Sequence, residues 1–387
     1  MKPKTALLHI GTPKTGTTSI QRWLANAQDD GSLAPVRYPL WAGGHNHQRL
    51  VSLYKPYEDL PPGFRQNYGP SGESYRRMRE RYRAFLFDEL SAASGAVLSG
   101  ESLCDLLSPL LAARLRVDLE SLGFREFHVV LYIRDPADYF LSVTQQDLKI
   151  AVRSPIVQDP AIFRYEFLRM AETWEQAFPG KLIIRKFPTD QGHDIIDDFA
   201  VVMQQCFGTA PPRVPLRMNT TYSAEAMKIM QDYRAARGTS TETLTPDVAR
   251  LVEFLDWSRQ HIPQTKPVLK PEVAEQIRAN HKEDAGLLHS RYGVDLGLQN
   301  CGPGSTFPRS RPFRVDEILE SVDPEVVDEL LLLLARIHLG HKRSLTWRIA
   351  AWAYRRIPPA RRPVRALSWV RSRINRENRW TRTITSP

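Results

Sequence analysis

The sequence predicts an α/β fold in which a mostly parallel, doubly wound sheet is flanked by helices, with further helices toward the C-terminus. Between residues 5 and 207, short apolar runs alternate at least four times with segments of helical periodicity, which is the pattern of successive βα units. The run at 127–133 is almost continuously hydrophobic, as in a strand covered on both faces. The 387 residues are enough for one large domain with additions, or for two domains.

The first apolar run, at 7–10, leads into a Gly- and Pro-containing turn that opens directly into a helix. That helix has apolar residues at helical spacing, namely Ile20, Trp23, Leu24 and Ala27. Such a junction directs unpaired backbone N–H groups and the positive end of the helix dipole at the loop. Because a lysine and several hydroxyls lie in the same loop, we expect an anion cradle, for instance for a phosphate. It would be formed by Thr12, Pro13, Lys14, Thr15, Gly16, Thr17 and Thr18.

Two later strands end in charged residues. The strand expected at 95–100 is followed by Glu101, and the strand at 127–133 is followed by Arg134. Functional groups collect at the carboxyl ends of parallel strands. Asp135 is placed as the N-cap of the next helix and Pro136 as its first residue, and Ser142 lies on that helix. Arg134 with Ser142 makes a second candidate anion site, although Arg134 could equally be a structural ion-pair residue.

The segment at 36–82 is polar and rich in large aromatic side chains: Tyr38, Trp41, Tyr54, Tyr57, Tyr68 and Tyr75. Such side chains suit a sugar or another polyhydroxyl acceptor, and they also suit the packing of an irregular loop. His45 and His47 lie in this segment, either lining a cleft or exposed to solvent. Beyond it, we expect helices near 163–174 and 194–207, a strand at 181–187, and a mainly helical region from 224 to 340.

The net charge of +10 comes from the C-terminal tail. Residues 341–387 hold thirteen Lys and Arg against one acidic residue, which is +12 and leaves the body at about −2. Four of the eight tryptophans also lie there, and basic segments with tryptophan suit an anionic membrane surface. A disordered tail and a helix packed on the body are the other interpretations, and specific nucleic-acid binding lacks a recognisable module.

The sequence carries no signal of export or of a membrane span. Its three cysteines are far apart, and no apolar run approaches the roughly 18 residues that a spanning helix needs. We therefore expect a cytoplasmic protein, with the tail as a possible peripheral contact to the inner membrane surface.

Three motifs in order resemble sulfotransferases that use 3′-phosphoadenosine-5′-phosphosulfate (PAPS). They are P-K-T-G-T-T after the first strand, S-G-E at the end of a later strand, and R-D-P-x5-S, and the likeness covers roughly residues 5–190. The resemblance implies a P-loop-like sulfotransferase fold, with the first loop on the 5′-phosphosulfate and with Arg134 and Ser142 on the 3′-phosphate. The region that begins at Arg217 is only vaguely similar to polar segments of bacterial members, and this likeness implies that Arg217 is a further cofactor-binding residue. The implied organisation is a sulfotransferase-like domain at 1–310, a helical extension at 311–340 and the tail.

The same resemblance assigns catalytic roles. Lys14 would face the leaving oxygen, and Glu101 would be the base that accepts the proton of the acceptor hydroxyl, with His47 as second choice. The acceptor would be a carbohydrate or glycolipid, and we expect no metal. One alternative is a P-loop kinase of nucleosides or small molecules, although Lys14 precedes Gly16 whereas the kinase lysine follows its second glycine. The other is a non-catalytic, membrane-associated protein that binds PAPS.

Overall fold

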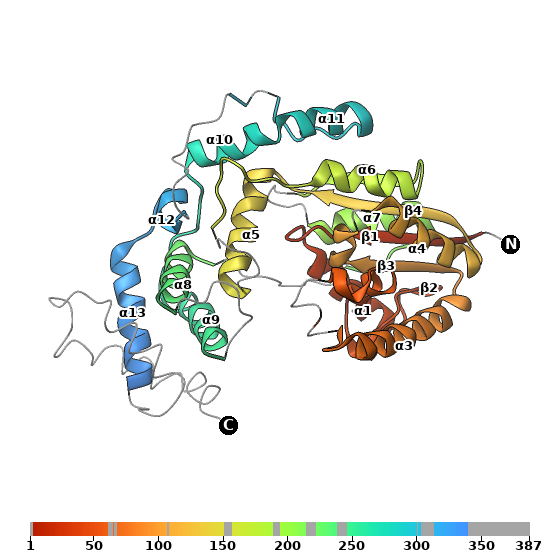
Figure 1. Cartoon of the computed structure of the whole chain (residues 1–387), viewed down its shortest axis with the longest axis horizontal. Helices are drawn as coiled ribbons and strands as arrows, with labels where there is room; N and C mark the ends of the chain where they lie inside the picture. The colour runs from red at the N-terminus through yellow and green to blue at the C-terminus, as the bar shows by residue number, and fades with distance from the viewer. Residues whose placement is uncertain are drawn as a thin grey trace. The chain divides into compact units, whose positions relative to one another are not determined.

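A computed structural model describes residues 3–60, 65, 68–106, 108–150, 157–188, 194–213, 222–237, 246–299, 301–302 and 313–339 (Figure 1). Arg217 and the tail at 341–387 lie outside these residues. The described residues form two compact units. The first comprises those of 1–139, 164–218 and 278–302, and the second comprises the others. These units interleave along the chain.

The first unit is built on a five-stranded sheet in the order β2-β3-β1-β4-β5, and every neighbouring pair is parallel. The α/β class and the parallel sheet are thus confirmed. Leu7 of the central strand lies opposite Val97 on one side and His128 on the other. The two-residue edge strand β2 has no counterpart among the predicted strands. The strands are β1 (Lys4–Ile10), β2 (Val36–Arg37), β3 (Gly95–Gly100), β4 (Phe124–Ile133) and β5 (Leu182–Lys186).

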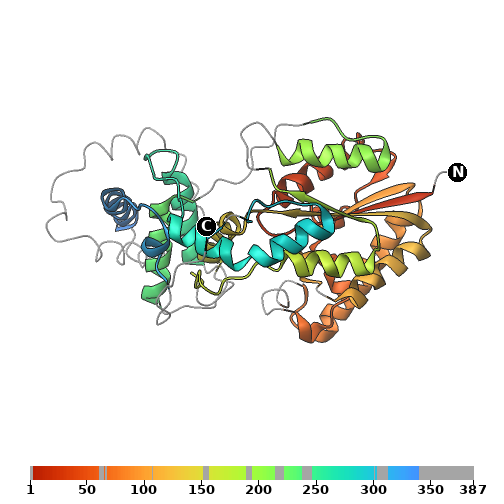
Figure 2. The ribbon, with the colours of Figure 1, turned by 90° about the horizontal axis from the view of Figure 1, so that it is seen from above.

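Helices cover both faces of this sheet (Figure 2). Helices α1 (Thr17–Asp29) and α7 (Ile195–Phe207) bury Trp23 and Phe199 against alternate strand residues such as Val130. Helices α4 (Pro109–Ser121) and α6 (Phe167–Ala177) contact each other on the opposite face, where Phe127 packs on Phe178 with ring centroids 5.6 Å apart. Because successive strand residues point to opposite faces, the continuous apolar runs predicted from the sequence supply both layers.

The segment between β2 and β3 packs as an irregular layer. Its described residues include the short 3₁₀ helices η1 (Trp41–Gly43), η2 (Gln48–Leu53) and η3 (Tyr57–Asp59), and then α3 (Gly72–Ser91). Tyr38, Tyr54, Tyr68 and Tyr75 are buried, and the hydroxyl of Tyr75 donates to the carbonyls of Ser52 and Lys55, both at 2.9 Å. The packing interpretation therefore holds for these four tyrosines, whereas Trp41 and Tyr57 remain half-buried.

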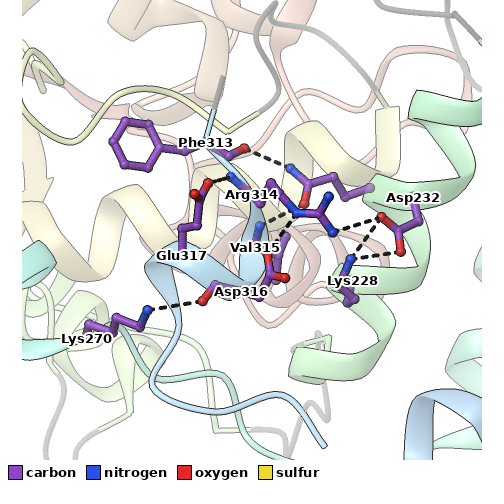
Figure 3. A network of polar contacts seen from close by, with 9 residues as sticks. Lys228, Asp232, Lys270, Phe313, Arg314, Val315, Asp316 and Glu317 are labelled. Carbon is purple, nitrogen blue, oxygen red and sulfur yellow. Dashed lines mark hydrogen bonds and ion pairs between the residues drawn. The ribbon is translucent and has the colours of Figure 1, made fainter. Parts of the chain in front are cut away.

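The second unit is helical, as expected for most of 224–340. Its helices are α8 (Ala224–Arg237), α9 (Pro246–Ser258), the four-residue α12 (Val315–Ile318) and α13 (Pro324–Leu339), together with most of α5 (Pro136–Ile150) and α10 (Pro271–Asn280). A polar network holds α12 on α8 (Figure 3). Lys228 pairs with Asp232 at 2.9 Å, and Arg314 lies 3.8 Å from the same carboxylate and 3.2 Å from Asp316. In addition, the Lys270 ammonium donates to the Asp316 carbonyl at 3.1 Å.

Among the residues described, none of the helices has both the length and the apolar character needed to cross a bilayer.

Candidate anion-binding site

Three strand ends meet at one edge of the sheet in the first unit. The central strand β1 lies between β3 and β4, so the loop at 11–16, Glu101 and Arg134 all leave the sheet at adjacent positions. The helix after β1 covers one face, whereas α4, which follows β3, covers the other. Ligands of open parallel sheets bind at the carboxyl ends of strands where the connections diverge in this way.

Hydrogen bonds from three threonine hydroxyls stabilise the conformation of the loop at 11–16. The Thr15 hydroxyl donates to the Thr12 carbonyl at 2.8 Å, and the Thr17 hydroxyl approaches the same carbonyl at 3.3 Å. The Thr12 hydroxyl donates to the Tyr132 carbonyl at 2.7 Å, which ties the loop to β4. All three threonines are buried. Their hydroxyls therefore serve the loop itself, while Pro13, Lys14, Gly16 and Thr18 are partly exposed.

The loop turns into α1 through two residues with left-handed backbone. Gly16, the residue before the helix, has φ +72°, and a Cβ there would lie 2.8 Å from the Ile195 side chain. Lys14 has φ +67°, which is uncommon for a residue with a side chain and is a form of backbone strain typical of ligand-binding loops. Since Gly16 has no side chain to cap the helix, the first amides of α1 face the loop without a capping oxygen.

Arg134 contacts this loop directly. Its Nη1 donates to the carbonyl oxygen of Lys14 at 3.3 Å, and its guanidinium lies 5.4 Å from the centre of the Phe187 ring. Its Nε is buried and makes no hydrogen bond among the described residues, and the closest oxygen of Asp138 is 4.0 Å away. A single ion pair at that distance stabilises little. Arg134 therefore has donor capacity left for an anion.

Asp135 fixes the start of the helix behind Arg134, as predicted. One carboxylate oxygen of Asp135 accepts from the amides of Ala137 and Asp138 at 2.9 and 3.1 Å. The other accepts from Nε of Arg278 at 2.9 Å. Pro136 is the first residue of α5, also as predicted. Ser142 lies on the part of α5 that belongs to the second unit, so its role toward a phosphate stays a prediction.

The backbone of Glu101 lies directly beside the loop at 11–16. The amide of Gly11 donates to the Gly100 carbonyl at 3.3 Å. A Cβ at Gly11 would lie 2.5 Å from Thr17 and 3.2 Å from Cα of Glu101, so this position requires glycine. Glu101 is the first residue of the 3₁₀ helix η4 (Glu101–Asp105) and is partly exposed. The candidate base and the candidate anion loop are therefore neighbours, although they are ninety residues apart in the sequence.

His47 is part of the protein interior. Its Nδ1 accepts from the amide of Ser99 at 2.8 Å, and its Nε2 bonds the Pro39 carbonyl at 2.7 Å. The side chain is 1% exposed, and burial lowers its pKa to about 4. With both ring nitrogens in use, His47 positions the end of β3 and is a poorer candidate base than Glu101. His45, in contrast, is partly exposed.

A second buried histidine lies under the same strand end. Nδ1 of His9 bonds the Ser99 hydroxyl at 2.8 Å, and its ring contacts Tyr132 and Phe199. Burial lowers the pKa of His9 to about 3, so the ring is neutral at ordinary pH. Both histidines thus bond to Ser99, two residues before Glu101.

Sequence reasoning missed Tyr165, which reaches the same edge from the segment before α6. Its ring stacks on Tyr139 at 3.8 Å, and its hydroxyl lies near the Thr12 side chain and the Arg134 backbone. Its amide donates to Nε2 of the buried His281 at 2.7 Å. Because this placement depends on a contact 116 residues away, no local pattern in the sequence signals it.

Comparison with known proteins adds no relative: no family model matches the chain, and neither does any curated protein or solved structure.

Proposed function

We propose that this protein is a sulfotransferase that moves a sulfuryl group from PAPS to an acceptor hydroxyl. The observation that carries the proposal is the position of β1 between β3 and β4, which puts the anion loop, Glu101 and Arg134 at one edge. These are the three parts that the sequence resemblance requires, and they come from distant segments. Such an edge supplies a phosphosulfate cradle, a carboxylate base and a guanidinium for a phosphate.

The proposed reaction is an in-line transfer. The acceptor oxygen forms a bond to sulfur, the bond between sulfur and the bridging oxygen breaks, and its electron pair stays on the 5′-phosphate. Glu101 accepts the proton of the acceptor hydroxyl. Lys14 and the first amides of α1 stabilise the charge that develops on the bridging oxygen, because preorganised donors act best where charge grows. Arg134 binds the 3′-phosphate, since a guanidinium forms bidentate hydrogen bonds with phosphate oxygens.

The test is the binding of adenosine 3′,5′-bisphosphate, the nucleotide product, by isothermal titration calorimetry without Mg²⁺. We expect a dissociation constant in the micromolar range or below. ATP with Mg²⁺ is the comparison ligand, because a kinase would need the metal on its polyphosphate. A preference for ATP with Mg²⁺ would favour the kinase alternative and would contradict the proposal.

Transfer itself is tested with labelled PAPS and a fractionated cell extract. Label in a polysaccharide or glycolipid fraction would support the expected acceptor class. Label in protein or small metabolites would contradict that class and identify a different acceptor. Tight binding of the bisphosphate with no transfer to any fraction would favour the non-catalytic alternative.

A further inference from the structure

A late segment of the first unit returns to the strand end that carries Arg134. The described residues of 278–302 belong to the first unit, although the stretch before them belongs to the second. Arg278, the first of these residues, bonds Asp135, which directly follows Arg134 in the chain. A residue 143 positions away from Asp135 thus reaches the immediate surroundings of the candidate phosphate site.

Arg278 holds the Asp135 carboxylate with two donors. Its Nε donates to one oxygen at 2.9 Å and its Nη2 to the other at 3.4 Å. The Asp135 side chain is 17% exposed and that of Arg278 is 36% exposed, so this pair is screened less than a surface pair. The oxygen bonded at 3.4 Å also accepts from the amides of Ala137 and Asp138, in the first turn of α5. Arg278 therefore orients the carboxylate that caps this helix.

His281 supports the same helix start through a second set of contacts. It is the buried residue directly before α11 (Lys282–Tyr292), and its Nε2 accepts from the Tyr165 amide at 2.7 Å. Tyr165 in turn stacks on Tyr139 of α5, with ring centroids 3.8 Å apart. The Tyr139 amide donates to the Asp135 carbonyl at 2.8 Å, so the stack restrains the turn that the Asp135 carboxylate caps.

The contacts that the guanidinium of Arg134 itself makes are weak. Its Nη1 donates to the Lys14 carbonyl at 3.3 Å, its Nε lies 4.0 Å from the Asp138 carboxylate, and the Phe187 ring centre is 5.4 Å away. The first two distances are long for a charged donor. The position of the guanidinium therefore depends on the backbone where β4 ends and α5 begins, which is the backbone that the Asp135 cap orders.

Arg278 also balances the charge beside the candidate phosphate site. The carboxylates of Asp135 and Asp138 belong to residues within four positions of Arg134, and they would repel a phosphate bound there. Because Arg278 pairs with Asp135, a cation other than Arg134 neutralises one of these two charges. More of the charge of Arg134 then remains for an anion.

We propose that Arg278 is a positioning residue for Arg134. Through Asp135 it orders the backbone that carries the guanidinium, and it neutralises the adjacent carboxylate without contacting the nucleotide. The proposal rests on the sulfotransferase function and deepens it, because Arg134 is the residue proposed to bind the 3′-phosphate of PAPS. Arg278 thereby sets the preference for a nucleotide that carries this phosphate. Such support matters because a binding group must be held within about 0.5 Å of its productive position.

The experiment compares two nucleotides that differ only in the 3′-phosphate. Adenosine 3′,5′-bisphosphate and adenosine 5′-monophosphate are titrated into the full-length protein by calorimetry without Mg²⁺. We expect Arg278→Gln to weaken bisphosphate binding by about fivefold or more and monophosphate binding by less than about twofold, because only the 3′-phosphate depends on Arg134. Arg291→Gln is the matched control, because it breaks the ion pair of α11 with Glu172 in the same segment. It should leave the preference for the bisphosphate unchanged.

Two double variants separate positioning from a general loss of stability. In an Arg134→Ala background, Arg278→Gln should change bisphosphate affinity by less than about twofold, because the group that it positions is gone. Asp135→Asn combined with Arg278→Gln should recover most of the lost affinity, since asparagine still caps the helix and leaves no unpaired carboxylate. If Arg278→Gln does not fold, Arg278→Lys keeps the charge with a single donor group. It should lose part of the bisphosphate affinity and none of the monophosphate affinity.

Several outcomes would overturn the positioning role: equal losses for the two nucleotides, an unchanged bisphosphate affinity, a full loss that persists in the Arg134→Ala background, or no recovery with Asp135→Asn. This failure is distinct from that of the proposed function. Normal bisphosphate binding by the wild type with no selective loss in Arg278→Gln removes only the positioning role. A wild-type protein that binds no bisphosphate, or that prefers ATP with Mg²⁺, removes the sulfotransferase function and the role of Arg278 with it.

Discussion

Nη1 of Arg134 lies 3.3 Å from the backbone carbonyl oxygen of Lys14 and donates a hydrogen bond to it. This bond joins the end of β4 to the loop after β1, so a hydrogen bond connects Arg134 of the second predicted anion site to the loop of the first. It also draws the Lys14 carbonyl toward β4 while the residue holds a left-handed backbone. The guanidinium thus supports the loop, while its buried Nε–H has no hydrogen-bond acceptor among the described residues.

Arg134→Ala should weaken the binding of adenosine 3′,5′-bisphosphate by ten- to a hundredfold, because a hydrogen bond to a charged group contributes about 1.5–3 kcal/mol. Calorimetric titration measures the change. Arg125→Ala, at the opposite end of β4, is the control and should bind as the wild type does. An Arg134→Ala protein with unchanged affinity would show that the arginine only supports the loop.

Glu101→Gln should lower kcat by roughly a hundredfold or more, since general base catalysis contributes about 10²–10⁴-fold. Bisphosphate affinity should stay within a few-fold of wild type, because the amide keeps the size of the carboxylate. Steady-state transfer from labelled PAPS gives the rates, and Glu120→Gln on α4 serves as the matched carboxylate control. Full turnover by Glu101→Gln would reject the assignment and make His47 the next residue to test, despite its burial.

Stability should fall steeply in mild acid because His9 and His47 are buried and neutral. Burial lowers their pKa values to about 3 and about 4, against an ordinary value near 6.5. Below pH 6.5 the unfolded chain binds protons that the folded chain does not. Each histidine therefore costs about 1.4 kcal/mol of stability per pH unit from pH 6.5 down to its folded pKa. The full stability is present above pH 6.5.

Urea unfolding at pH 7.5, 6.5 and 5.5 measures this slope. His9→Gln should reduce it by about half, although the variant itself will be less stable at neutral pH. An identical slope in His9→Gln and the wild type would mean that other groups control the acid response.

Loss of the hydroxyl should lower the free energy of unfolding at Tyr132 but not at Tyr165. The Tyr132 hydroxyl donates to Asp198 at 2.6 Å, so Tyr132→Phe should cost about 1–2 kcal/mol of unfolding free energy. The Tyr165 hydroxyl is buried and has no partner of good geometry among the described residues. Tyr165→Phe should therefore be neutral or stabilising by up to about 1 kcal/mol. Equal losses in the two variants would show that Tyr165 makes a bond comparable to that of Tyr132.

The parts of the site that local sequence determines were predictable. Apolar runs indicated where β1, β3 and β4 end, and the ends of these runs identified the residues that come directly after each strand as site candidates. The Gly and Pro residues of the first loop predicted a helix directly after the turn, and this helix begins at Thr17. Asp135 with Pro136 predicted the start of α5. These signals are local because strand length, turn chemistry and capping depend on neighbours in the chain.

The features that depend on distant contacts were not predictable in the same way. The strand β2 has two residues and exists through its pairing with β3. The sequence allowed the tyrosines at 38, 54, 68 and 75 either to contact a ligand or to pack in the interior. Their burial depends on contacts with distant segments, which the sequence pattern does not show. The loop hydroxyls of Thr15 and Thr17 looked like ligand donors, yet the folded loop directs both at the Thr12 carbonyl.

The central place of β1 also affects how the chain folds while it is being synthesised, because both neighbours of this strand come later in the sequence. This strand is synthesised before its partners β3 and β4, which follow about ninety and 120 residues later. Until Tyr132 has emerged, the Thr12 hydroxyl has no carbonyl to bond, and the apolar strand has no neighbour on that side. Contacts so distant in sequence slow folding and leave hydrophobic strands exposed meanwhile. The nascent chain should thus depend on chaperones until β4 has been made, and substitutions in β4 should reduce soluble yield more than substitutions in β2.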